Sequence, residues 1–68
     1  MITVYVDGRA VELEPSMTVR HAVLRYDQEA YERCADGLSV VVDEAGHEVD
    51  PEGAVFDGMQ LFVTEPAG

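Results

Sequence analysis

The chain is 68 residues long and has a formal net charge of -10, with fourteen acidic residues, four arginines and no lysine. A chain of this length forms one domain and buries only about 60% of its unfolded surface, so it has little room for a large catalytic cleft. We therefore expect a binding module or a protein substrate rather than an enzyme, and no cofactor. Nucleic acid is excluded as a partner, because binding to a phosphate backbone depends on Lys and Arg.

Cysteine content and hydropathy exclude further classes of protein. The single cysteine, Cys34, can form no internal disulfide and supplies too few thiolates for an iron–sulfur cluster or a zinc site. No apolar run approaches the ~20 residues of a membrane span, and Met1 leads directly into an alternating segment without a signal sequence. We expect a cytoplasmic protein that does not bind membranes. Its acidic surface either docks on a basic protein surface or only keeps the domain soluble.

The first segment, ITVYVDGRAVELEP, predicts a β-hairpin with one buried face. Ile2, Val4 and Val6 alternate with polar residues, and an Asp-Gly pair follows that favours a tight turn. Val11 and Leu13 then alternate with acidic residues, and a proline ends the second strand because it cannot donate to a ladder.

The next segment, SMTVRHAVLRYDQEAYERCADG, predicts a helix that packs across the hairpin. Apolar residues recur at helical spacing, and Ser16 or Thr18 can cap the N-terminus. The sequence allows two positions for the C-terminal end of this helix. The helix continues to Gly37, or it ends near Tyr26-Asp27 and leaves the following residues as a second, looser piece.

Two further strands complete the pattern. The β-branched run at 38–42, in which Leu38, Val40 and Val42 alternate with Ser39 and Val41, predicts a central strand that is covered on both faces. A short return at 47–49 and a loop follow, and an Asp-Gly turn leads into the last strand, MQLFVT. The expected core is the following set: Val4, Val6, Val11, Leu13, Val19, Val23, Val40, Val42, Leu61 and Val63.

The order of hairpin, helix, strand, short strand and last strand is that of the β-grasp fold. This α+β fold has a mixed four- to five-stranded sheet with one helix packed across it, and the first and last strands lie parallel in the middle. We expect a single domain over residues 1–64 and a flexible C-terminal tail over 65–68, because the tail has no alternating pattern.

Two segments, VDGRAVELEPSMTVRHAV and VFDGMQLFV, resemble ubiquitin-like β-grasp proteins of the ThiS/MoaD sulfur-carrier family. They match that family's hairpin, its Thr-Val helix start and its Asp-Gly turn into the last strand. The resemblance implies that an E1-like adenylating enzyme is the partner. It also implies that the C-terminal carboxylate is adenylated and then converted to a thiocarboxylate that delivers sulfur.

The carrier tail implied by the resemblance is Ala67 and Gly68. Gly68 matches the family's terminal glycine, whereas Ala67 replaces the penultimate one and restricts the backbone. Pro66 stiffens the tail further. The alternative is an interaction module that kept the fold and lost the Gly-Gly end.

Other residues are weaker candidates. Arg9, Met59 and Phe62 could contribute to a partner surface, or they could be ordinary core and surface residues. His47 lies among carboxylates, where a solvated acidic turn is favoured over a metal site because the ligands have no defined spacing. His21 is expected to be a surface or rim histidine. Cys34 is expected to be a packed thiol whose pKa is raised by its acidic neighbours.

Overall fold

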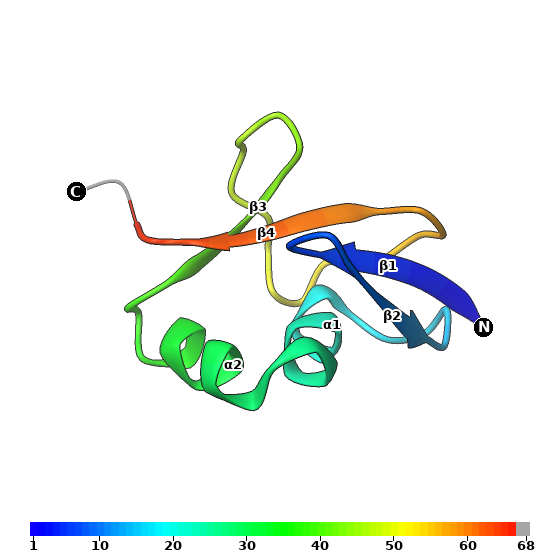
Figure 1. Cartoon of the computed structure of the whole chain (residues 1–68), viewed down its shortest axis with the longest axis horizontal. Coiled ribbons are helices and arrows are strands. Elements are labelled where there is room, and N and C mark those ends of the chain that lie inside the picture. The colour runs from blue at the N-terminus through cyan, green and yellow to red at the C-terminus, as the bar shows by residue number, and fades with distance from the viewer. Residues whose placement is uncertain (67–68) are drawn as a thin grey trace.

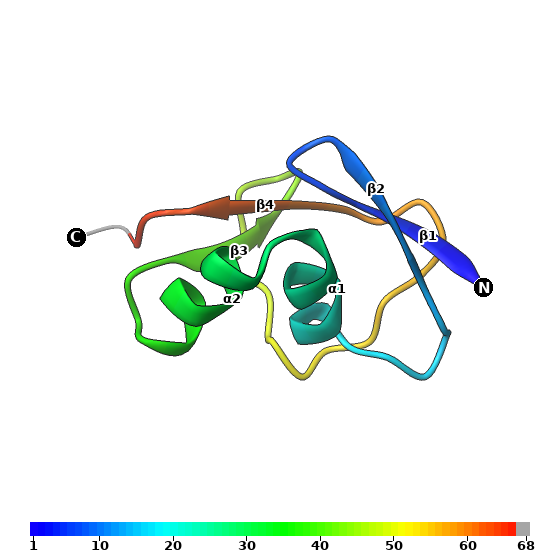
Figure 2. The same cartoon turned by 60° about the horizontal axis from the view of Figure 1, so that its bottom comes forward.

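The computed structural model describes residues 1–66, which form four strands and two short helices (Figure 1). Their bounds are as follows: β1 (Ile2–Val6), β2 (Arg9–Leu13), α1 (Val19–Tyr26), α2 (Gln28–Ala35), β3 (Val40–Asp43) and β4 (Gln60–Thr64). The strand order in the sheet is β2-β1-β4-β3, with β1 and β4 parallel and the outer pairs antiparallel. Both helices lie on one side of the sheet (Figures 1 and 2). The expected parallel pairing of the first and last strands is therefore confirmed.

The β1–β2 hairpin forms as the sequence predicts. Asp7 and Gly8 both have positive φ, at 50° and 82°, which is the backbone of a type I′ turn. Val4 pairs with Val11 and Ile2 with Leu13, so the apolar side chains of the two strands share one face. Val4 and Leu13 are fully buried beneath the helices.

The helical region is two helices rather than one, which corrects the expected fold. Asp27 ends α1 and begins α2 with an extended backbone, at φ -165° and ψ 121°. Aspartate is a poor residue for a helix interior. Asp27 is the N-cap residue of α2, although its side chain makes no capping hydrogen bond, and Glu29 places a negative charge in the first turn of α2. The sequence DQE thus specifies a new helix start. Apolar spacing alone could not show it, because Ala30 stands four residues after Tyr26, as in a continuous helix, and is buried in α2.

The N-terminus of α1 is satisfied by backbone from a distant loop. The Val19 N–H donates to the Gly53 carbonyl at 3.1 Å, and the Arg20 N–H donates to the Pro51 carbonyl at 2.9 Å. These are two of the amide groups that an isolated helix leaves without partners. An ion pair between Arg20 and Glu52, at 3.0 Å, lies beside them. The loop between β3 and β4 is therefore attached to the start of the helix.

His21 has a structural role at the same helix end. Its Nδ1 accepts the Thr18 backbone N–H at 3.1 Å, in the position that Glu or Gln takes in a capping box. The imidazole must carry no proton on Nδ1 to accept this bond. The expected rim histidine is thus half-buried and is part of the helix cap.

The strand β3 differs from the expectation in position and in the direction of its side chains. It lies at the edge of the sheet rather than in the middle. Val41 is the buried residue, whereas Val40 and Val42 are half-buried and Leu38 is 59% exposed. The β-branched run does not indicate a central strand. Instead, the outward side chains pair across strands, with Val42 opposite Phe62.

The loop between β3 and β4 packs against the edge of the sheet and against the core. Its first part folds back on the outer edge of β3, where the Val49 N–H donates to the Val41 carbonyl and Glu48 bridges to Val42. The expected short strand at 47–49 is thus an isolated bridge. Farther along, Val55 is buried in the core. No helix within residues 1–66 has the length and apolar character needed to cross a membrane.

The core is one cluster between the sheet and the helices. Seven of the expected residues are buried: Val4, Val6, Val11, Leu13, Val19, Val23 and Leu61. Val63 is half-buried against this cluster, and four further residues complete it: Ala22, Ala30, Val41 and Val55.

Val41→Ala and Val40→Ala form a matched pair that tests the orientation of β3. Val41→Ala removes buried methyl groups and should cost about 1 kcal/mol or more of unfolding free energy beyond Val40→Ala, because burial is worth about 0.8 kcal/mol per CH₂ before any cavity cost. Urea denaturation followed by circular dichroism measures both. Equal losses in the two variants would contradict the orientation of this strand.

Candidate functional site

Two aspartates hold the central parallel pair of strands together. The backbone pairing of β1 with β4 is short, with Tyr5 beside Gln60 and Val6 beside Leu61. At one end, the Asp57 carboxylate accepts the Thr3 N–H at 2.9 Å. At the other end, the Asp7 carboxylate accepts the Val63 N–H at 3.2 Å. Both aspartates belong to the Asp-Gly turns of the sequence, so each turn also extends the ladder by one side-chain hydrogen bond.

Asp7 joins three elements. While one of its oxygens accepts the Val63 N–H of β4, the other accepts the Tyr26 hydroxyl at 3.1 Å from the end of α1. The guanidinium of Arg9 lies 5.6 Å from the centre of the Tyr26 ring, within the range of a cation–π contact. The hydrogen bond to Asp7, and its negative charge, raise the pKa of Tyr26 above the ordinary value of 10.0.

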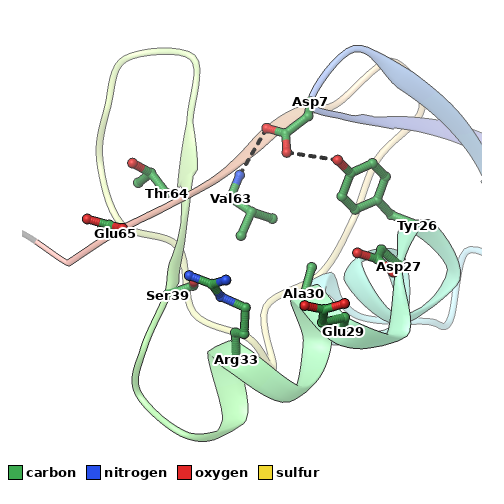
Figure 3. A pocket seen from close by; sticks show the side chains of 10 residues that line it. All are labelled: Asp7, Tyr26, Asp27, Glu29, Ala30, Arg33, Ser39, Val63, Thr64 and Glu65. Atoms are coloured by element: carbon green, nitrogen blue, oxygen red, sulfur yellow. Dashed lines mark hydrogen bonds between the residues drawn. The ribbon is translucent and has the colours of Figure 1, made fainter.

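A hollow of about 310 Å³ lies beside this cluster, between the start of α2 and the end of β4 (Figure 3). Its lining residues are Asp7, Tyr26, Asp27, Glu29, Ala30, Arg33, Ser39, Val63, Thr64 and Glu65. Four of these are carboxylates and one is a guanidinium. Arg33 reaches from α2 toward β4 in Figure 3, and it makes no ion pair within residues 1–66. The hollow is therefore negatively charged, and it lies where the chain leaves the last strand.

A second, smaller hollow of about 190 Å³ lies between the helices and β3. Its walls include the side chains of Tyr31, Cys34 and Val41. Cys34 is half-buried, as expected, but burial rather than its acidic neighbours raises the pKa of its thiol. Arg33 acts in the opposite direction. A thiol in this environment is a weak nucleophile, so this hollow offers no reactive cysteine.

The three residues expected at a partner surface do not lie together. Arg9 lies over Tyr26, on the face of the sheet that the helices cover. Met59 is half-buried and packs against the core. Phe62 is 37% exposed on the opposite, open face, beside Val42. The carrier tail, Ala67 and Gly68, lies outside the described residues.

His47 lies in an exposed turn whose geometry is set by an aspartate. The Asp43 carboxylate accepts the N–H groups of Ala45 and His47 at 2.9 and 3.0 Å. Within residues 1–66, no group of three or more His, Cys, Asp or Glu side chains is placed to hold a metal ion.

Sequence reasoning missed the part played by Asp7. The Asp-Gly pair predicts the turn, and the backbone conformation bears this out. The carboxylate's contacts with Tyr26 and Val63 join residues 19 and 56 positions apart in the chain. No local pattern carries that information. The only sequence signal is that an aspartate stands where asparagine would serve the turn equally well.

The chain matches no protein-family model, and no curated protein is significantly similar to it. Inferences about its function therefore depend on its own residues and geometry.

Asp7→Asn and Asp7→Ala separate the turn from the side-chain hydrogen bonds. Asparagine tolerates positive φ and keeps one acceptor oxygen, whereas alanine loses both features. We expect Asp7→Ala to lower the unfolding free energy by about 1–2 kcal/mol and Asp7→Asn by less, as measured by urea denaturation. Amide hydrogen exchange at Val63 should accelerate in the alanine variant. Unchanged exchange there would show that the bond to β4 contributes nothing.

Tyr26 should ionise above the ordinary tyrosine pKa of 10.0. A folded-state pKa above the unfolded value means that the Tyr26–Asp7 contact stabilises the fold fully below pH 10.0, and that this contribution is lost as pH rises through the folded pKa. Ultraviolet titration of tyrosinate, with Tyr26→Phe as the assignment control, measures the shift. Asp7→Asn should bring the Tyr26 pKa down, and no change in that variant would mean that Asp7 is not the cause.

Proposed function

We propose that the chain is a small ubiquitin-like protein with a β-grasp fold, similar to the ThiS/MoaD sulfur carriers, which performs no chemistry by itself. The support from its architecture is a mixed sheet of order β2-β1-β4-β3 with helices on one face only. This arrangement is compatible with a β-grasp, although its helical region is divided into α1 and α2.

One observation carries the proposal. β4 is a central strand, and it leads directly into the C-terminal residues, with Thr64, Glu65 and Pro66 all exposed. Asp7 fixes β4 at Val63, just before this exit. A tail that starts from a central strand of the sheet can enter a partner's active site while the domain stays folded outside.

The proposed chemistry takes place on the carboxylate of Gly68. An oxygen of this carboxylate attacks the α-phosphorus of ATP in the active site of an E1-like adenylating enzyme, and pyrophosphate leaves. A sulfur nucleophile supplied by the partner's system then attacks the acyl carbon, and AMP leaves. A thiol reductant next cleaves the bond that still joins this sulfur to its donor. A thiocarboxylate then remains at the end of the chain. The chain contributes the acyl group and the recognition surface.

A second candidate function is a tail-independent interaction module. The observation that favours it is the apolar part of the open sheet face, where Phe62 is 37% exposed beside the half-buried Val42. Ala67 also departs from the Gly-Gly end of the carriers. In this alternative the domain binds another protein with a basic surface and is not activated.

Changes in the tail distinguish the two functions. With an E1-like enzyme captured by the full chain, ATP–pyrophosphate exchange and the intact mass of the chain report activation. Ala67→Gly should speed exchange because glycine relieves the backbone restriction, and deletion of Gly68 should abolish it without changing the Tm. If the full chain never supports exchange, and Phe62→Ala abolishes capture of its partner, the interaction module replaces the carrier.

A further inference from the structure

The acidic hollow beside the end of β4 has no role in the proposed activation of the C-terminal tail. Three of its carboxylates, those of Asp27, Glu29 and Glu65, make no side-chain hydrogen bond or ion pair within residues 1–66. They come from the start of α2 and from the segment after β4, so they stand on two sides of the hollow (Figure 3).

Ser39 supplies an independent indication that the hollow accepts a ligand. This serine is the one buried polar residue within residues 1–66, with only 5% of its surface exposed, and its side chain lines the hollow. Its hydroxyl makes no hydrogen bond to another described residue. No fully buried side-chain N or O atom within residues 1–66 lacks a hydrogen-bond partner, so this oxygen is open to solvent in the hollow, where it can accept a hydrogen bond from a donor that enters.

We infer that this hollow binds an arginine side chain of a partner protein. The carboxylates are not grouped closely enough to hold a metal ion, which disfavours a small cation. A guanidinium suits carboxylates on separate walls, because its five N–H groups point in several directions in one plane. The Ser39 hydroxyl, deeper in the hollow, accepts one further N–H.

Arg33 adjusts the charge of the hollow. Its guanidinium lies in the lining without an ion pair, so it offsets part of the negative charge of the four carboxylates. A ligand cation must overcome this repulsion. Removal of the Arg33 charge therefore has the opposite effect to removal of a carboxylate, which gives the inference two tests of opposite sign.

This arginine site goes beyond the proposed function, because its binding does not require Gly68. Thr64 and Glu65 nevertheless line the hollow. An arginine bound there lies next to the segment through which β4 leads to the tail.

The test uses the full chain and a short capped peptide with one arginine between glycines. Titration into isotope-labelled protein should shift the amide resonances of Glu29, Ser39, Thr64 and Glu65. The same peptide with citrulline, which has the shape of arginine without its charge, should not shift them. Binding should weaken as salt is added from 0.01 M to 0.1 M, where the Debye length falls from about 30 Å to about 10 Å.

A pair of triple variants separates the site from the net charge. The site variant carries Asp27→Asn, Glu29→Gln and Glu65→Gln. Asp27 is the N-cap residue of α2 but makes no side-chain capping hydrogen bond that the change would remove. The control carries Glu14→Gln, Glu44→Gln and Glu48→Gln, three exposed residues outside the hollow that remove the same charge. We expect binding about tenfold weaker in the first and little changed in the second.

Two single variants complete the test. Ser39→Ala should weaken binding of the arginine peptide, and Arg33→Gln should tighten it. Equal losses in the two triple variants, or equal shifts with citrulline, would overturn the inference in favour of general attraction to an acidic surface. A lysine peptide that binds as tightly as the arginine peptide would overturn the assignment to guanidinium. Deletion of Gly68 should leave arginine binding unchanged, so failure here is distinct from failure of the carrier function.

Discussion

The parallel pairing of β1 with β4 is the constraint on which the rest of the structure depends. A parallel pair needs a long connection, and here nearly the whole chain between Asp7 and Met59 supplies it. The pairing covers few residues, and each end is extended by an aspartate, Asp57 on Thr3 and Asp7 on Val63. Every other element is placed by this pair: β2 and β3 flank it, the helices cover one of its faces, and the β3–β4 loop satisfies the N-terminus of α1.

The hairpin and the last strand could be predicted because their information is local. Alternation fixed which side chains of β1 and β2 face the core, and Asp7-Gly8 specified the turn by its tolerance of positive φ. The break at Asp27 was visible only as one of two alternatives, since Ala30 keeps helical spacing with the residues of α1 whether or not the helix is continuous. The preference of Asp27 for a helix end and the continuous apolar period disagreed there. The structure has the helix end at Asp27, without a side-chain cap, and still buries Ala30.

The sequence-based predictions were wrong or incomplete where burial depends on residues that are distant in the chain. The run at 40–42 is apolar on both faces, and this pattern is typical of a central strand. In the structure Val41 faces the core, while Val42 pairs outward with Phe62 at the sheet edge. The hollow beside β4 was equally invisible, because its walls come from residues 7, 26–33, 39 and 63–65. No spacing rule unites such a set, so only the tertiary structure could reveal it.

Seven of the fourteen acidic residues fall into two groups with different surroundings. Four aspartates, Asp7, Asp43, Asp50 and Asp57, accept backbone N–H groups and so form part of the fold. Their charge is a by-product of using the shortest carboxylate, which reaches nearby amides at turns. The carboxylates of Asp27, Glu29 and Glu65 have no such partner within residues 1–66, and they meet at one hollow. A charge that the fold does not use, gathered beside the end of the central strand, is available to a partner.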